Sequence, residues 1–102
     1  MNKPWRRVEV HGDSMRPALQ PGDRLLVVRW PRLRPGHLVA LARPDRVVVK
    51  RVQAVDHGMV TVAGDNAEAS TDSRHFGPVP RAHVLGRAVY RYAPTGRAGR
   101  LH

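Results

Sequence analysis

The sequence predicts a mostly β protein, a compact domain built from antiparallel strands. Its 102 residues suffice for one domain with a modest core. Nine glycines and nine prolines are spread along the chain, which favours short strands and turns over long helices. Between these turn residues lie apolar stretches of strand length. The expected strands are Trp5–Val10, Arg24–Trp30, His37–Ala42, Arg46–Val55, Met59–Ala63 and Val84–Tyr92.

Turn sequences account for where these strands begin and end. In chain order they are PGD, RPGH, RPD, DHG, GDN and FGPVP. The segment SMRPAL (14–19) is compatible with one helical turn, because proline is tolerated in the first turn of a helix. The domain is expected to span residues 1–93. Residues 94–102 have little apolar content and are expected to form a flexible tail.

The expected strand 46–55 carries a lysine on an apolar face. Side chains alternate across a strand, so one face carries Val48, Lys50, Val52 and Ala54. The other face carries Val47, Val49, Arg51, Gln53 and Val55. Lys50 therefore either extends along a sheet edge toward water or is held with little water around it.

The composition excludes several classes of site and protein. Without cysteine the chain has no disulfide or thiolate metal site, and no two histidines have the close spacing of a helical zinc motif. No metal or cofactor is therefore expected. No apolar stretch approaches the roughly 18 residues that span a bilayer, and the first residues lack the apolar region of a signal peptide. We expect a soluble, cytoplasmic protein without a transmembrane segment in this chain; the alternative is a membrane-associated protein from which an anchor was trimmed.

The net charge of +10 at pH 7 raises the question of nucleic-acid binding, because clustered Lys and Arg neutralise phosphates. Here the basic residues are spread from Arg6 to Arg100, with few aromatic residues between them. Sixteen are arginines and two are lysines, an imbalance typical of a coding bias. No specific nucleic-acid partner is expected. The charge also predicts weak contact with anionic membrane surfaces.

Ser14, in the stretch HGDSMRPALQPGDRLLV, is either a turn residue or a nucleophile. A nucleophilic serine needs a base. The six histidines lie outside any triad motif: GxSxG is broken by Arg16, and S-x-x-K by Pro17. Of the two lysines, Lys3 and Lys50, the second lies on the apolar strand face, where loss of water lowers the pKa of an amine. Arginine could not replace it, since its pKa stays above about 12. The alternative, an ordinary strand lysine, stays open.

A third segment, GDNAEASTDSRHFGPV (64–79), is unusually rich in hydroxyl and carboxylate groups. Ser70, Thr71 and Ser73 are placed to orient a lysine amine. Asp72 and Arg74 are placed to form an ion pair that holds the loop. Taken singly, each of these residues is more often a solvated turn residue than a functional one.

Together the three segments resemble the bacterial type I signal peptidase family and its relatives, the Ser/Lys proteases that include the LexA-like self-cleaving repressors. The similar stretches are GDSMRPALQPGDRLLV, VVVKRV, GDNAEASTDSRHFGPVP and VLGRAVYRY, in the same order and with similar spacing. The resemblance implies the compact antiparallel β domain of the signal peptidase and LexA-like protease type. Within this group, a short chain without a membrane anchor is most similar to the maturation proteases of nickel-type superoxide dismutase.

The resemblance implies a role for each matching residue. Ser14 would be the nucleophile, Lys50 the general base, and Ser70 the residue that directs the lysine amine toward Ser14. The oxyanion and substrate pocket would comprise Gly12, Asp13 and Met15, with one oxyanion donor from the backbone N–H of Ser14. The structural loop would comprise Asp65, Asn66, Asp72 and Arg74. The chain departs from the family pattern at Gly12, where many signal peptidases carry a hydroxyl residue that donates to the oxyanion.

The function expected from these roles is that of a serine endopeptidase that removes an N-terminal extension from a soluble precursor protein. A nickel superoxide dismutase precursor is the candidate substrate. The alternatives are a signal peptidase acting on exported proteins and a catalytically silent binding module of the same fold. A self-cleaving repressor fragment is disfavoured, because no helix-turn-helix pattern precedes Ser14.

Overall fold

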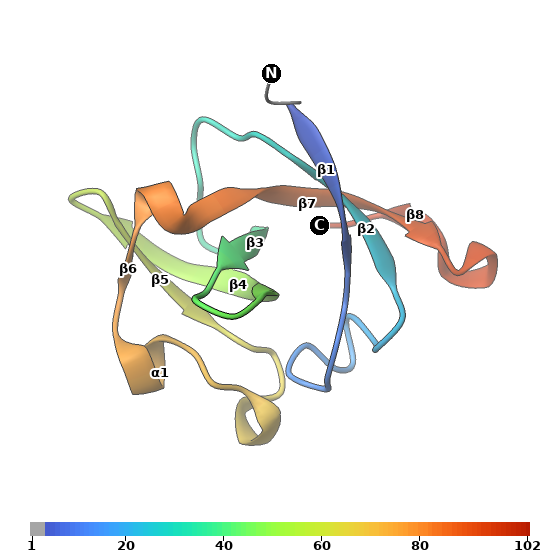
Figure 1. The fold of residues 1–102 in the computed structure, drawn as a ribbon, viewed down its shortest axis with the longest axis horizontal. Helices are drawn as coiled ribbons and strands as arrows, with labels where there is room; N and C mark the ends of the chain where they lie inside the picture. Colours follow the sequence, from blue (N-terminus) through green and yellow to red (C-terminus); the bar gives the residue numbers. More distant parts are fainter. Residues whose placement is uncertain (1–3) are drawn as a thin grey trace.

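The computed structural model describes residues 4–102; residues 1–3, which include Lys3 and begin the domain expected over 1–93, lie outside the described residues. Within this part of the chain, eight strands form one curled sheet in which every pair is antiparallel (Figure 1). The strand order is β1-β2-β7-β3-β4-β5-β6, and β8 pairs with β7. The strands are β1 (Trp5–Glu9), β2 (Arg24–Val28), β3 (Leu38–Ala42), β4 (Val47–Asp56), β5 (Met59–Ala63), β6 (Val79–Pro80), β7 (Val84–Ala93) and β8 (Gly99–Arg100).

The mostly β, antiparallel class predicted from the sequence is confirmed. All six expected strands are present, with ends at most two residues from those expected. The helices are one short α-helix, α1 (Ser73–Phe76), and the 3-10 turns η1 (Ala67–Ala69), η2 (Arg81–His83) and η3 (Thr95–Arg97), as far as residues 4–102 are concerned. Residues 14–19 form no helix but a turn with one hydrogen bond of α-helical spacing, from the Leu19 N–H to the Met15 carbonyl at 2.9 Å.

Both faces of the central strands are buried, which explains the continuous apolar sequence of β3. Leu38 and Ala40 pack into a cluster on one face, and Val39 and Leu41 pack into a cluster on the other. The first cluster comprises Val8, Val10, Met15, Leu19, Leu25, Val27, Leu38, Ala40, Val49 and Ala88. The second comprises Leu33, Val39, Leu41, Val52, Val60, Val62, Val79 and Val84. β4 contributes to both, with Val49 in the first cluster and Val52 in the second.

Strand β4 has an unpaired edge over part of its length. Residues 47–51 pair with β3, whereas pairing with β5 begins only at Arg51. Among the strands of residues 4–102, the stretch 47–50 therefore has a neighbour on one side only. A register shift between Val52 and Ala54 interrupts the side-chain alternation, so Ala54, which was expected to share the face of Lys50, is exposed beyond the shift.

The C-terminal segment lies against the sheet in this structure, unlike the frayed conformation expected for residues 94–102. β8 pairs with β7, and Leu101 packs against the first apolar cluster. Arg97 of η3 donates to the buried carboxylate of Asp23, which also accepts from Arg91 and from the Gln20 N–H. Arg91 and Arg97 are far from Asp23 in the sequence, so local composition could not predict these two contacts.

Candidate active site

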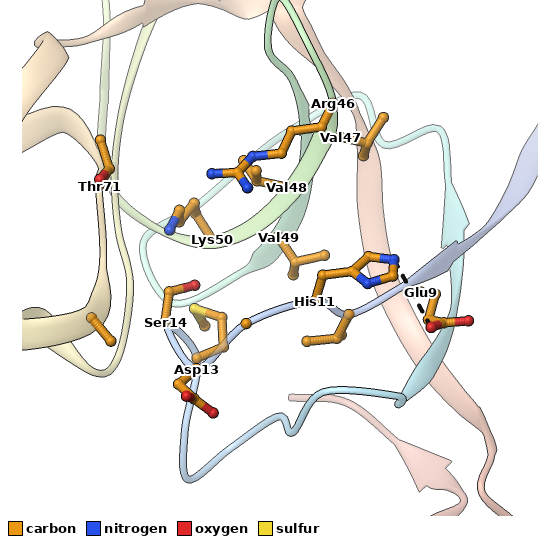
Figure 2. Close-up of a pocket in the computed structure, with 14 residues that line it drawn as sticks. Glu9, His11, Asp13, Ser14, Arg46, Val47, Val48, Val49, Lys50 and Thr71 are labelled. Carbon is orange, nitrogen blue, oxygen red and sulfur yellow. Dashed lines mark ion pairs between the residues drawn. The ribbon is translucent and has the colours of Figure 1, made fainter.

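Three segments that are distant in the sequence enclose one pocket. The loop after β1, the free stretch of β4 and the loop between β5 and α1 line a cavity of about 410 Å³ (Figure 2). Ser14 lies on the first segment, Lys50 on the second, and Ala69 and Thr71 on the third. These are the three segments that the sequence analysis singled out.

Lys50 is the buried base candidate of this pocket, because its side chain is 4% exposed. Its Nζ donates a hydrogen bond to Ser70 Oγ at 2.9 Å. Burial lowers the pKa of the Lys50 amine below its ordinary value; the Asp72 carboxylate opposes this shift, and the positive charges of Arg46 and Arg74 add to it. The surroundings of Lys50 therefore favour a neutral amine, the form that accepts a proton.

Ser70 and Asp72 fix the direction of the Lys50 amine. The Ser70 hydroxyl donates to Asp72 Oδ2 at 2.7 Å, which leaves the oxygen lone pairs of Ser70 to accept from Lys50. Asp72 is fully buried and also accepts from the Gly64 N–H at 2.8 Å and from Arg74 Nε at 2.9 Å. The hydrogen bond from Arg74 is the largest of the causes that hold the pKa of Asp72 far below its ordinary range, against the opposing effect of burial. Asp72 is therefore an ionised acceptor, and Ser70 must donate to it.

Ser73 has a different contact from Ser70. Its hydroxyl accepts a hydrogen bond from the Val62 N–H at 2.9 Å, which ties the start of α1 to β5. Asp72 caps the same helix by accepting from the Arg74 N–H. Ser73 and Asp72 thus attach the loop to β5 and to the residue that follows it, and Arg74 pairs with Asp72.

Asn66 and Gly64 attach the Ser14 loop to the loop that carries Ser70. The Ser14 carbonyl accepts from the Asn66 N–H at 2.8 Å, and the Asp13 carbonyl accepts from Asn66 Nδ2 at 3.1 Å. Gly64 lies so close that a Cβ on it would be 2.6 Å from the Ser14 carbonyl oxygen and 2.3 Å from Ser70 Oγ. Only glycine fits here without moving one of the two loops.

Ser14 and Lys50 line the same pocket, and Figure 2 shows the amine on the side of the cavity next to the serine. Ser14 is half-buried. No hydrogen bond joins the Ser14 hydroxyl to the Lys50 amine among the contacts of residues 4–102. Catalytic hydrogen bonds are often longer without substrate, so this arrangement is compatible with a dyad.

The other expected pocket residues differ in how they contribute. Met15 is 1% exposed and belongs to the first apolar cluster, so it forms an apolar wall of the pocket. Gly12 has a φ of 75° and offers the pocket only backbone. The Asp13 side chain is exposed and is paired with Arg16.

Arg51 was not identified as a site residue from the sequence, yet it fixes the geometry beside Lys50. Its Nε and Nη2 donate to Asp65 Oδ1 and Oδ2, each at 2.8 Å, and its Nη1 donates to the Gly36 carbonyl at 2.9 Å. The hydrogen bond to Asp65 raises the pKa of Arg51. Asp65, expected as a structural residue, is thus a bidentate partner of β4. The one feature of the sequence that pointed to Arg51 was its position directly after the candidate base, Lys50.

Two kinds of feature are absent from residues 4–102. These residues contain no group of three or more His, Asp or Glu side chains arranged to hold a metal ion. They also contain no helix that combines the length and apolar character needed to cross a membrane.

The chain is similar in sequence to known peptidases. Residues 47–93 match the family described as signal peptidase, peptidase S26. The chain is 34% identical to the mitochondrial ATP-independent inner membrane protease subunit 1a of Arabidopsis thaliana, over 90% of this chain and 73% of that protein. It is 30% identical to the mitochondrial inner membrane protease subunit 2 of Schizosaccharomyces pombe, over 90% of this chain and 67% of that protein. A shorter stretch, 39% of this chain, is 50% identical to signal peptidase I of Leptolyngbya laminosa, of which it covers 20%.

Proposed function

Because the chain belongs to the peptidase S26 signal peptidase family, we propose that it is a serine endopeptidase that removes an N-terminal extension from a precursor protein. In this proposal Ser14 is the nucleophile and Lys50 the general base. The observation that carries the proposal is the Lys50 amine, which is buried, hydrogen-bonded to Ser70 and directed into the pocket that Ser14 lines.

The proposed reaction needs Lys50 to be neutral before the attack. Its amine takes the proton of the Ser14 hydroxyl as the oxygen attacks the peptide carbonyl. The resulting ammonium then protonates the leaving amine, which breaks the C–N bond and leaves an acyl-enzyme on Ser14. Water, deprotonated by the same amine, hydrolyses this ester. Ser70 acts as a positioning residue throughout, because its hydroxyl is held by Asp72.

One oxyanion donor is assigned to the backbone N–H of Ser14. Position 12 is glycine, so it lacks the hydroxyl that many signal peptidases carry there as an oxyanion donor. The second donor must come from another group.

The free edge of β4 is the proposed binding site for an extended substrate. An unpaired strand edge offers backbone N–H and C=O groups to an incoming strand. Residues 47–50 form such an edge beside the pocket, and the walls next to Ser14 include Val48, Met15 and Ala69. These short or buried apolar walls favour small side chains next to the cleaved bond.

The test is digestion of a library of ten-residue peptides by the wild type and by Ser14→Ala, with the products identified by mass spectrometry. We expect the wild type to cut after small residues and Ser14→Ala to cut nothing. Equal cleavage by both proteins would overturn the assignment of Ser14 as the nucleophile. If the folded wild type cuts no peptide and no precursor, the remaining function is that of a catalytically silent binding module.

The finer proposal for the substrate is a nickel superoxide dismutase precursor, processed by a soluble, cytoplasmic enzyme. It rests on the resemblance described above, and none of the relatives named here points to it specifically. Incubation with such a precursor, followed by mass spectrometry of the new N-terminus, tests it. The second candidate is an exported precursor, which the names of the relatives favour, since they include inner membrane proteases and a signal peptidase I.

A further inference from the structure

Arg46 lies at the outer end of the proposed substrate edge. It directly precedes β4 and lines the same cavity as Ser14 and Lys50. Because side chains alternate along a strand, Arg46, Val48 and Lys50 lie on one face. Figure 2 shows the Arg46 side chain extending over the pocket on the side where Lys50 and Val48 lie.

The guanidinium of Arg46 has no carboxylate partner among residues 4–102. The two acidic side chains that line the same cavity have other partners. Asp13 pairs with Arg16, and Glu9 lies 3.9 Å from His11 Nε2 and 3.6 Å from Arg24 Nε. An exposed cation on a groove wall is therefore available to a ligand.

The groove continues beyond Arg46 as an electropositive surface. A second cavity, of about 520 Å³, shares Arg46, Glu9 and His11 with the first and is also lined by Arg6 and Arg7. Its lining thus holds three arginines and one acidic residue. A bound chain that follows this groove away from Ser14 meets the positive charge of these arginines beside the apolar side chains of Val8 and Val47.

The spacing along β4 sets where a substrate would meet this charge. An extended chain beside β4 advances by about 3.3 Å per residue, as β4 itself does. The backbone of Arg46 lies four positions before Lys50, and its side chain extends over the pocket toward Val48 and Lys50 (Figure 2). An extended substrate therefore passes the guanidinium about two to four residues from the bond that lies beside Ser14 and Lys50.

We infer that Arg46 selects precursors that carry an acidic side chain about two to four residues from the cleaved bond, on the side of the substrate that lies along β4. This inference rests on the proposed function, because it places the cleaved bond at Ser14. The shape of the guanidinium favours a carboxylate, which it can bind through two parallel hydrogen bonds.

The test uses ten-residue alanine- and serine-based peptides in which a single Asp, Asn or Lys is moved through every position. Cleavage by the wild type is followed by mass spectrometry, and binding of the fluorescein-labelled peptides to Ser14→Ala by fluorescence anisotropy. We expect Asp at one position to raise kcat/KM and affinity about 5- to 50-fold over Asn, the range from exposed ion pairs to charge-assisted hydrogen bonds. In Arg46→Ala the preference for Asp over Asn should disappear. In Arg46→Glu the peptide with Lys at that position should be preferred over the peptide with Asn.

Arg32→Ala is the matched control, since it removes the same charge from an exposed residue that lines neither cavity. It should retain the preference for Asp. Cleavage that depends on Ser14 but shows no preference for Asp, or a preference that survives Arg46→Ala, would overturn the inference and leave the peptidase assignment intact. Binding that depends on Arg46 without any cleavage would overturn the peptidase assignment and keep the acidic-ligand groove. If no peptide is cleaved and Arg46→Ala does not change binding, both the inference about Arg46 and the peptidase assignment are overturned.

Discussion

The Ser70 hydroxyl donates to Asp72 Oδ2 at 2.7 Å and accepts from Lys50 Nζ at 2.9 Å. The first bond determines the second, because an ionised carboxylate can only accept hydrogen. The Asp72 carboxylate is in turn held by Arg74 and by the Gly64 N–H. The direction of the lysine amine is therefore set by a series of hydrogen bonds that begins at the N-terminus of α1.

Ser70→Ala should lower kcat by about 10- to 1000-fold with little change in KM, because it removes the acceptor that orients the amine but no proposed substrate contact. Steady-state kinetics on a cleavable peptide measures this split. Ser73→Ala is the matched control, since it removes a hydroxyl that accepts from the Val62 N–H. It should lower stability and leave kcat closer to that of the wild type. The reverse order, with Ser73 essential and Ser70 dispensable, would contradict the assignment of the loop residues.

Lys50→Arg should be as inactive as Lys50→Met. Arginine keeps its proton at any pH that the fold survives, so it cannot take the proton of Ser14. The measurement is kcat/KM for both variants, with circular dichroism to check that each is folded. Substantial peptidase activity of a folded Lys50→Arg would exclude Lys50 as the base.

Arg46→Ala should move the acidic limb of the kcat/KM profile to higher pH. The reason is the sign of the interaction: the positive charge of Arg46 helps to lower the pKa of Lys50, so its removal raises that pKa. Activity then rises with pH later than in the wild type, because the neutral amine forms later. Arg32→Ala should leave the limb in place, and added salt should reduce the difference between the two variants. A wild-type rate that is flat from pH 5 to 10 would count against lysine as the base altogether.

The fold class was predictable because strand signals are local. Every expected strand is present, since apolar segments bounded by Gly, Pro and Asp turns specify a strand without information from elsewhere in the chain. β6 and β8 were not predictable. Each has two residues, contains Pro or Gly, and exists because a neighbouring strand lies beside it.

The candidate site was predictable as a set of residues but not as an arrangement. Periodicity placed Lys50 on the more apolar strand face, and the loop composition indicated Ser70, Thr71, Asp72, Ser73 and Arg74. The family resemblance then distinguished Ser70 from the other hydroxyl residues. Nothing in the local sequence indicated that Arg51 binds Asp65 or that Gly64 lies between the Ser14 carbonyl and the Ser70 hydroxyl. Both contacts depend on how the loops meet. Catalytic roles for Ser14, Lys50 and Ser70 stay predictions until the variants are measured.

Arg97→Ala should lower the free energy of unfolding, because it removes a charged hydrogen-bond donor from the buried carboxylate of Asp23. Arg97 Nη2 donates to Asp23 Oδ2 at 2.9 Å, and the Asp23 side chain is 2% exposed. Chemical denaturation measures the change. Arg100→Ala, an exposed change in the same segment, is the control and should have little effect. A neutral Arg97→Ala would favour the flexible tail expected for residues 94–102 over a docked one.

Lys50→Met should stabilise the protein while abolishing its activity. Lys50 loses solvation in the folded state, and its folded pKa is lower than in the unfolded chain. Between those two pKa values the unfolded chain binds the extra proton, so stability rises with pH in that window. Below the folded pKa the buried ammonium destabilises the fold, and an unbranched apolar side chain of similar size removes that effect. Urea denaturation from pH 5 to 10 should therefore show a more stable variant at the acidic end, with the difference shrinking as pH rises through the Lys50 pKa. A variant destabilised at every pH would mean that the amine contributes more through its hydrogen bond to Ser70 than its burial costs.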